Sequence, residues 1–135
     1  MSDRVWLIGP GDKVLKCDAA GVVTYTSSDL TDDALMELAP IQGDHRGTYR
    51  PVAHPDRYLT ADATTSTPGG NPCLQVYGAS ASEALGPDGL PGFYQRWNVG
   101  IWPDGLIRTF VPYIEQGAGH GHPWGSAGFT VVKQS

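Results

Sequence analysis

Charged residues are scarce in this sequence, and the basic ones form no cluster. Only 17% of the residues are charged, and 9 Lys and Arg stand against 14 Asp and Glu, for a formal net charge of −5. Proteins that bind DNA or RNA normally carry a basic surface that neutralises phosphates, so we expect no nucleic-acid partner. The densest basic group, Arg46, Arg50 and Arg57, is either a candidate anion site or a set of packing side chains.

Long apolar runs are also missing. No segment approaches the roughly 18 apolar residues that a membrane-spanning helix needs. Residues 1–4 lack the apolar core of a signal peptide. We therefore expect no membrane insertion, and a cytoplasmic or virion-associated protein.

Cysteine occurs only twice, at Cys17 and Cys73. Each cysteine lies in an apolar, strand-like stretch, and such surroundings raise the pKa of a thiol and make it unreactive. A Cys–His nucleophile is therefore not expected. A disulfide between the two residues stays open, although the absence of a signal peptide favours free thiols.

Catalytic and cofactor-binding motifs are missing as well. The sequence contains no Gly-x-Ser-x-Gly elbow, no Gly-x-Gly-x-x-Gly turn and no phosphate-binding loop. Its acidic residues gather in turns and at one expected helix start, where turn and capping chemistry explains them. We therefore expect neither enzymatic activity nor a cofactor. These acids are Asp29, Asp32, Asp33, Asp56, Asp88 and Asp104.

Glycine, proline and aromatic residues are abundant instead. The 18 glycines and 11 prolines are unfavourable inside helices and suit turns. The 4 Trp, 6 Tyr and 3 Phe supply apolar surface for a core, which disordered chains lack. The composition predicts a single domain over residues 1–135, built of short strands joined by many turns.

Apolar and β-branched stretches between these turns predict about ten short strands. The first three are expected to form a meander, and a hairpin is expected across the turn at 103–105. Pro51 places the strand that contains it at a sheet edge or a strand end. The strands are expected at 5–8, 13–17, 22–26, 48–52, 57–61, 73–77, 93–101, 106–111 and 128–132.

Two short segments favour helices. Residues 32–38 follow the capping candidate Thr31 and end before Pro40, with a strand as the alternative interpretation. Residues 80–85 favour one helical turn that stops at Gly86. Together these elements predict a mostly β fold, as a barrel, trefoil or sandwich with one or two short helices.

Two features of the sequence carry a resemblance to a known family. Gln95-Arg96-Trp97 forms a Gln-x-Trp triplet, and an Asp-Gly-Leu-Ile-Arg strand follows it at 104–108. Residues 13–18 and 57–62 look like two copies of one strand, 44 residues apart. The pattern resembles the ricin-type β-trefoil lectins. That resemblance implies a β-trefoil-like barrel and the binding of carbohydrate.

Aromatic residues near the expected loops are the best candidates for ligand binding. Trp97 is expected in the core, because it alternates with Asn98 along its strand. Trp102 and Trp124 are expected at the surface, where a ring beside polar groups can stack on a sugar or contact a subunit. The alternative is a small apolar cluster beneath the long loop. The candidate ligand-binding residues are Trp102, Tyr113, Trp124, Asp104 and Asn98.

A pair of histidines, His120 and His122, offers two imidazoles at a spacing that suits a metal ion. A tetrahedral site needs one or two further ligands from distant residues, and the glycine-rich surroundings make a preorganised site costly. The alternative is an exposed polar loop, and we expect no bound metal.

Three functions remain open at this point. The first is a non-enzymatic binding module, lectin-like, that binds carbohydrate through loop aromatics. The second is a viral or phage structural or surface protein, such as a decoration, tail or capsid-associated component, which acts through subunit contacts. A homo-oligomer or larger assembly is possible in that case. The third is a small metal-dependent enzyme that uses the histidine loop.

Overall fold

Antiparallel strands dominate the part of the chain that the structure describes. The computed structural model describes residues 3–41, 43, 46–62, 75–92, 95–101, 105–110 and 129–134. Ten strands and three short helical segments occur in these ranges. The expectation of a mostly β fold with short helices is therefore confirmed.

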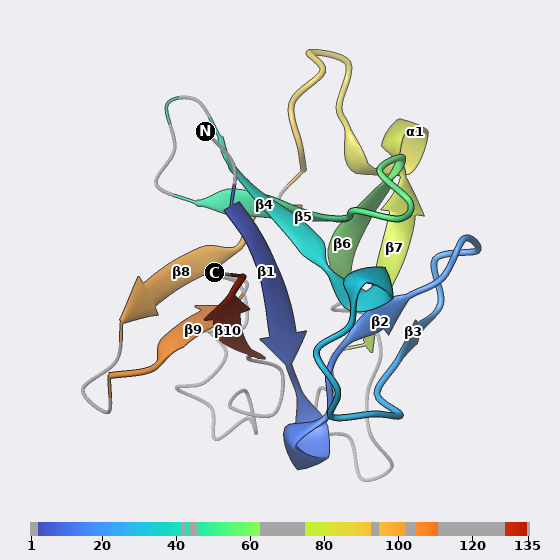
Figure 1. The fold of residues 1–135 in the computed structure, drawn as a ribbon. Helices are drawn as coiled ribbons and strands as arrows, with labels where there is room; N and C mark the ends of the chain where they lie inside the picture. Colours follow the sequence, from blue (N-terminus) through green and yellow to red (C-terminus); the bar gives the residue numbers. More distant parts are fainter. Residues whose placement is uncertain are drawn as a thin grey trace, which may run out of the picture.

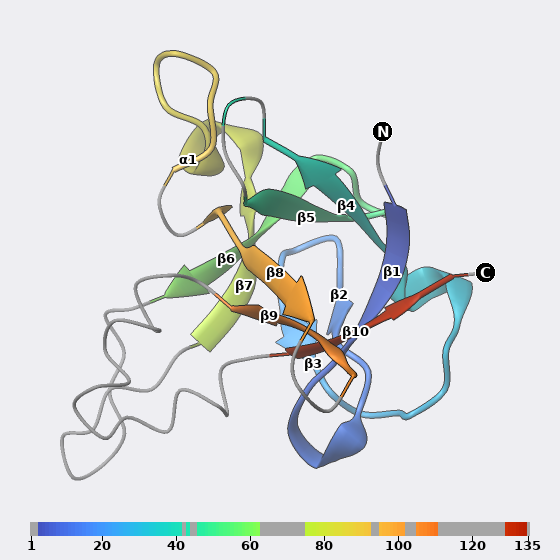
Figure 2. The same ribbon diagram turned by 90° about the vertical axis from the view of Figure 1, so that its left-hand side faces the viewer.

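A six-stranded antiparallel sheet forms the centre of the molecule (Figure 1). The order of its strands is β5-β4-β1-β10-β9-β8. Strand β1 pairs with β10, so the first and last described strands are neighbours, as both views show (Figures 1 and 2). The strands are β1 (Asp3–Ile8), β4 (Met36–Pro40), β5 (Gly47–Pro51), β8 (Asn98–Ile101), β9 (Ile107–Phe110) and β10 (Phe129–Lys133).

The two edges of this sheet, β5 and β8, approach each other at one point. Gly47 N donates to Trp97 O at 2.9 Å, and Trp97 N donates to Gly47 O at 2.8 Å. This single bridge does not extend into a ladder, so the described strands form no closed barrel. The edge position of β5 agrees with the expectation drawn from Pro51.

Two hairpins lie outside the six-stranded sheet. One pairs β2 (Lys16–Cys17) with β3 (Val23–Thr24), and the other pairs β6 (Arg57–Asp62) with β7 (Gln75–Ser80). The expected meander of the first three strands is confirmed in part: the second and third strands pair as β2 and β3, whereas β1 pairs with β10 and β4, and only one isolated bridge joins it to the segment before β2. The 3-10 turn η1 (Pro10–Asp12) separates β1 from that segment.

The two copies of the repeated sequence occupy equivalent places in the two hairpins. Each copy contributes the first strand of its hairpin, β2 or β6. Leu15 and Leu59, which correspond at the spacing of 44 residues, are both buried in the core. Both similar segments therefore begin a two-stranded hairpin and supply a buried leucine to the core.

The segment expected to form a helix at 32–38 is a strand for most of its length. Only a 3-10 turn, η2 (Asp32–Ala34), forms before β4 begins. Met36 is buried and Leu38 packs against the core, whereas Glu37 between them points to the other face. Because β4 has a hydrogen-bonded neighbour on each side, tertiary pairing overrides the local helix preference. The alternative interpretation as a strand is correct.

Two other local expectations are confirmed. A helical turn, α1 (Ala81–Ala84), follows β7, and the Glu83 carboxylate accepts hydrogen bonds from the backbone and hydroxyl of Ser80. Strands β8 and β9 pair as expected, although β8 begins at Asn98. No helix in the described ranges is long and apolar enough to cross a membrane.

Three aromatic rings form the centre of the core. The Trp97 ring lies 6.0 Å from Tyr49 and 5.8 Å from Phe129, measured between ring centroids. The Tyr49 side chain is fully buried, and burial raises the pKa of its hydroxyl well above the usual value. Thr109 approaches this hydroxyl but donates its own hydrogen to the carbonyl of Asn98. Within the described residues, the Tyr49 hydroxyl makes no hydrogen bond of normal geometry.

Candidate functional site

An open groove lies beside the first hairpin. Its volume is about 460 Å³. One wall comes from the segment before and within β2, and the other from the segment that runs from β3 through η2. The lining residues are Val14, Lys16, Thr26, Ser27, Asp29, Thr31, Asp32, Asp33 and Ala34.

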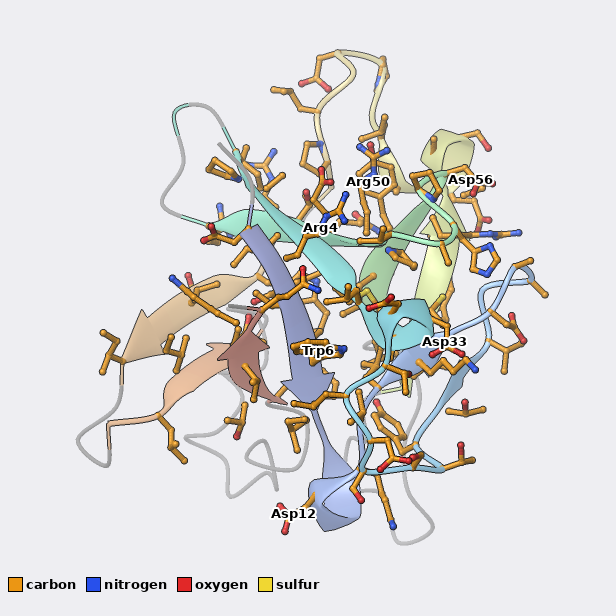
Figure 3. The ribbon with its side chains drawn as sticks, in the orientation of Figure 1. Arg4, Trp6, Asp12, Asp33, Arg50 and Asp56 are labelled. Carbon is orange, nitrogen blue, oxygen red and sulfur yellow. The ribbon has the colours of Figure 1, made fainter. Side chains whose placement is uncertain are left out.

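Backbone hydrogen bonds hold the two walls together. Val14 N donates to Ser27 O at 2.8 Å, which closes one end of the groove. Trp6 Nε1 on β1 donates to Thr31 O at 2.8 Å, which ties the opposite wall to the central sheet (Figure 3). The hydroxyl of Ser27 accepts from Asp29 N at 3.0 Å, so the turn that carries Asp29 is locally fixed.

One ion pair crosses the groove. Lys16 Nζ lies 2.6 Å from Asp33 Oδ2, and Asp33 also accepts a hydrogen bond from the Thr31 hydroxyl. The hydrogen bond from Lys16, followed by that from Thr31, lowers the pKa of Asp33. The carboxylates of Asp29 and Asp32 are exposed and make no hydrogen bond or ion pair with the described residues. The groove therefore presents free acceptors beside hydroxyl groups and one ammonium group.

The described residues contain no arrangement that suits metal binding. No group of three His, Cys, Asp or Glu side chains among them can hold a metal ion. His120 and His122 lie outside the described residues.

The Cys17 thiol is free and buried. Burial, with a smaller contribution from Asp18, raises its pKa to about 11. It is therefore protonated and a poor nucleophile at neutral pH, as its apolar surroundings in the sequence predict. Cys73 lies outside the described residues.

Four of the five ligand-binding candidates lie outside the described residues. These are Trp102, Asp104, Tyr113 and Trp124. Asn98 is described: it is half-buried at the start of β8, opposite Phe110 of β9, and it does not line the groove. The structure therefore does not bring Asn98 to the site that the groove residues form.

Sequence reasoning missed the groove. Asp29, Asp32 and Asp33 were assigned to turns and to the start of a helix, and Lys16 carried no signal on its own. A usable signal exists in the run of hydroxyl and carboxyl side chains at 26–33, which is longer than one cap or turn requires.

The Gln-x-Trp triplet has a structural role in the core. Trp97 is fully buried, as expected, and its indole Nε1 donates to Leu59 O at 3.0 Å. Gln95 is also buried, and its Nε2 donates to Thr60 Oγ1 at 3.3 Å. The triplet thus holds β6, which is the second copy of the repeated strand. The Gln-x-Trp triplet and the repeated strand, on which the family resemblance rests, therefore contact each other.

Two of the three arginines of the candidate anion site, Arg50 and Arg57, serve packing. Arg50 Nε donates to Pro55 O at 2.8 Å, and its guanidinium lies 5.1 Å from the centre of the Tyr58 ring. Arg57 donates to Ala19 O and Gly78 O, both at 3.2 Å, and so joins the two hairpins. These bonds favour packing over anion binding for both side chains.

A scan against models of known protein families finds no match for this chain, and a search of curated proteins finds no similar sequence.

Proposed function

We propose that this chain is a non-enzymatic binding module that binds carbohydrate in the groove beside the first hairpin. The observation that carries the proposal is the pair of free carboxylates, Asp29 and Asp32, among the hydroxyl groups of one open groove. Carboxylates accept hydrogen bonds from sugar hydroxyls, and Ser, Thr and Lys side chains donate to sugar oxygens. A groove that is largely formed before the ligand arrives is typical of small-molecule sites.

The arrangement of strands supports a β-trefoil-like architecture, which belongs to the same proposal. Strand β1 pairs with β4, β9 pairs with β10, and a bridge joins β5 to the residue before β8. In the sequence, the β2–β3 hairpin lies between β1 and β4, and the β6–β7 hairpin lies between β5 and β8. The pairs adjoin through β4–β5, β8–β9 and β10–β1. Residues 111–128, between β9 and β10, lie outside the described residues.

This threefold pattern strengthens the resemblance to the ricin-type lectins, which in turn implies sugar binding. The loop aromatics Trp102, Tyr113 and Trp124, together with Asp104, stay proposed as a second sugar-stacking surface. They are separate from the groove in sequence, so variants can distinguish the two surfaces.

A glycan array tests the proposal. The wild-type chain is expected to bind a defined set of glycans, and the double variant Asp29→Asn/Asp32→Asn is expected to bind them about tenfold or more weakly, because two charged acceptors are lost. The matched control is Asp12→Asn/Asp56→Asn, which removes the same charge at exposed positions outside the groove (Figure 3).

Three results separate the alternatives. Equal loss in both double variants assigns the effect to net charge and contradicts the groove. Loss in Trp102→Ala or Trp124→Ala, with none in the groove variant, moves the site to the loop aromatics. An array without any bound glycan overturns the carbohydrate function.

Subunit contacts are the second candidate function, as in a viral or phage surface component. The observation that favours it is an exposed apolar surface on the β8–β9 hairpin, where Ile101 is 78% exposed beside Val99 and Leu106. Exposed apolar patches on otherwise polar proteins often mark interfaces. Light scattering tests it: a defined oligomer that Ile101→Ser dissociates is the expected result, and a monomer at all concentrations contradicts it.

A further inference from the structure

Trp6 links the central sheet to the wall of the groove. It lies on the outer face of β1, opposite Val132 of β10, and is only half-buried. Its indole Nε1 donates to the carbonyl of Thr31 at 2.8 Å, across 25 positions of sequence. Figure 3 shows Trp6 on β1 and Asp33 on the segment that follows Thr31.

The carbonyl of Thr31 accepts a second hydrogen bond, from Ala34 N at 3.1 Å. This bond and the one from Leu35 N to Asp32 O form the 3-10 turn that carries Asp32 and Asp33. The hydroxyl of Thr31 donates to Asp33, and Asp33 pairs with Lys16. A continuous series of contacts therefore runs from β1 through Thr31 and Asp33 to β2.

We infer, on the basis of the proposed carbohydrate function, that Trp6 is a positioning residue for the groove. Trp6 does not line the groove; it acts through the Thr31 carbonyl, which sets where the turn with Asp32 and Asp33 begins.

Three other contacts hold this segment. The bond from Val14 N to Ser27 O lies at one end, and the bond from Val52 N to Leu35 O lies at the other. Between these ends the Lys16–Asp33 ion pair also joins the segment to β2, with side chains about half exposed, and the Ala34 side chain is buried. Exposed ion pairs contribute little, because solvent screens them and two long side chains must be ordered. Trp6 therefore supplies a directional contact that adds to the packing of Ala34 and to the preorganisation that lowers the entropic cost of binding.

Hydrogen exchange and sugar titration of Trp6→Phe test the inference. The variant keeps an aromatic ring, loses the N–H group that donates to the Thr31 carbonyl, and has a smaller ring at this half-buried position. We expect the amides of Ala34 and Leu35 to exchange about fivefold faster, the factor for loss of one typical hydrogen bond. We expect the affinity for lactose, the sugar probe, to fall by about the same factor, and the free energy of unfolding to fall by no more than about 1 kcal/mol, the loss of one hydrogen bond.

Arg4→Gln is the matched control, because Arg4 lies on the same face of the same strand and its side chain makes no contact with the groove segment (Figure 3). It should leave both exchange and affinity as in the wild type. If Trp6→Phe lowers the urea midpoint further, exchange at Ala34 and Leu35 is compared with exchange at Val131 of β10 in the same sample, because a global loss of stability speeds exchange at all three and a local loss only at the first two.

Unchanged exchange at Ala34 and Leu35 in Trp6→Phe overturns the inference, as does faster exchange with unchanged lactose affinity. A wild-type chain that binds neither lactose nor any glycan on the array contradicts the proposed function instead. In that case the exchange rates still decide whether Trp6 fixes the segment.

Discussion

At the scale of single residues, the core side chains differ in whether their polar atoms have partners. The indole of Trp97 donates to Leu59 O, and the amide of Gln95 donates to Thr60. The hydroxyl of Tyr49, in the same core, makes no such bond within the described residues. A buried polar group without a partner keeps its desolvation penalty and gains nothing in return.

This difference predicts opposite outcomes for two similar substitutions. Tyr49→Phe removes the unpartnered hydroxyl and should leave the free energy of unfolding unchanged or raise it by up to about 1 kcal/mol. Trp97→Phe removes a donor, leaves the buried carbonyl of Leu59 unpaired and puts a smaller ring in a fully buried position, so it should lower that free energy by about 2–4 kcal/mol. Urea unfolding at neutral pH measures both values. A loss of more than about 1 kcal/mol in Tyr49→Phe would show that its hydroxyl has a partner after all.

The sequence predicts the position of Trp97 but not the role of Trp6. Alternation along one strand is a local signal, and it correctly places Trp97 inside. The bond from Trp6 to Thr31 joins residues 25 positions apart, and no local pattern indicates it. For the same reason the acids of the groove were assigned to caps and turns, since their common surface exists only after β1 and β2 are in place.

At the scale of elements, the β8–β9 hairpin was predictable and strand β4 was not. The β8–β9 pairing follows from turn chemistry within a few residues. Strand β4 instead depends on its pairing with β1 and β5. Strand β1 lies 28 or more positions before β4 in the sequence, and β5 follows β4 shortly after. Its residues tolerate either helix or strand, so the pairing with two neighbours decides the outcome.

Contact between the two hairpins depends on Gly21. Its φ of +86° suits glycine, and a Cβ atom there would lie 2.2 Å from Gly78 O. The bond from Gly78 N to Gly21 O, at 2.8 Å, requires this close approach. Gly21→Ala should therefore lower the free energy of unfolding by about 2 kcal/mol or more, from backbone strain and the clash together.

Two glycines provide the controls for this prediction. Gly89 has a φ of +76° with nothing within 4 Å of a Cβ atom, so Gly89→Ala should show the strain alone, about 1 kcal/mol. Gly100 has neither feature, and Gly100→Ala should be close to neutral. Urea unfolding of the three variants should rank them in this order. Equal losses for Gly21→Ala and Gly89→Ala would contradict a role for the contact between hairpins.

At the scale of the whole molecule, the order of the strands could not be read from the sequence. Strand β1 pairs with β10, more than 120 positions away, and the sheet order mixes early and late strands. Periodicity reports which face of a strand is buried, not which strand lies beside it. The spacing of 44 residues between two similar strands was the one long-range signal, and each of these two strands begins a hairpin outside the six-stranded sheet.

The folded molecule as a whole should lose stability in alkali. Burial raises the pKa of Cys17 from 9.0 to about 11 and that of Tyr25 from 10.0 to about 12, and it raises that of Tyr49 further. The folded state therefore keeps these protons to higher pH than the unfolded chain does. Above about pH 9 the unfolded chain binds fewer protons, so the free energy of unfolding falls as pH rises and is unaffected by these groups below pH 9.

Urea unfolding between pH 7 and 11 measures this dependence. Cys17→Ala should delay the fall to about pH 10, where the tyrosines of the unfolded chain begin to ionise. Asp33→Asn is the control. Folding lowers the pKa of Asp33, so the stability that this carboxylate contributes is present above its usual pKa and is lost only in acid. The variant should therefore keep the same fall in alkali as the wild type. A free energy of unfolding that stays constant from pH 9 to 11 would mean that these three groups titrate in the folded state as they do in water, and that the core is open to solvent.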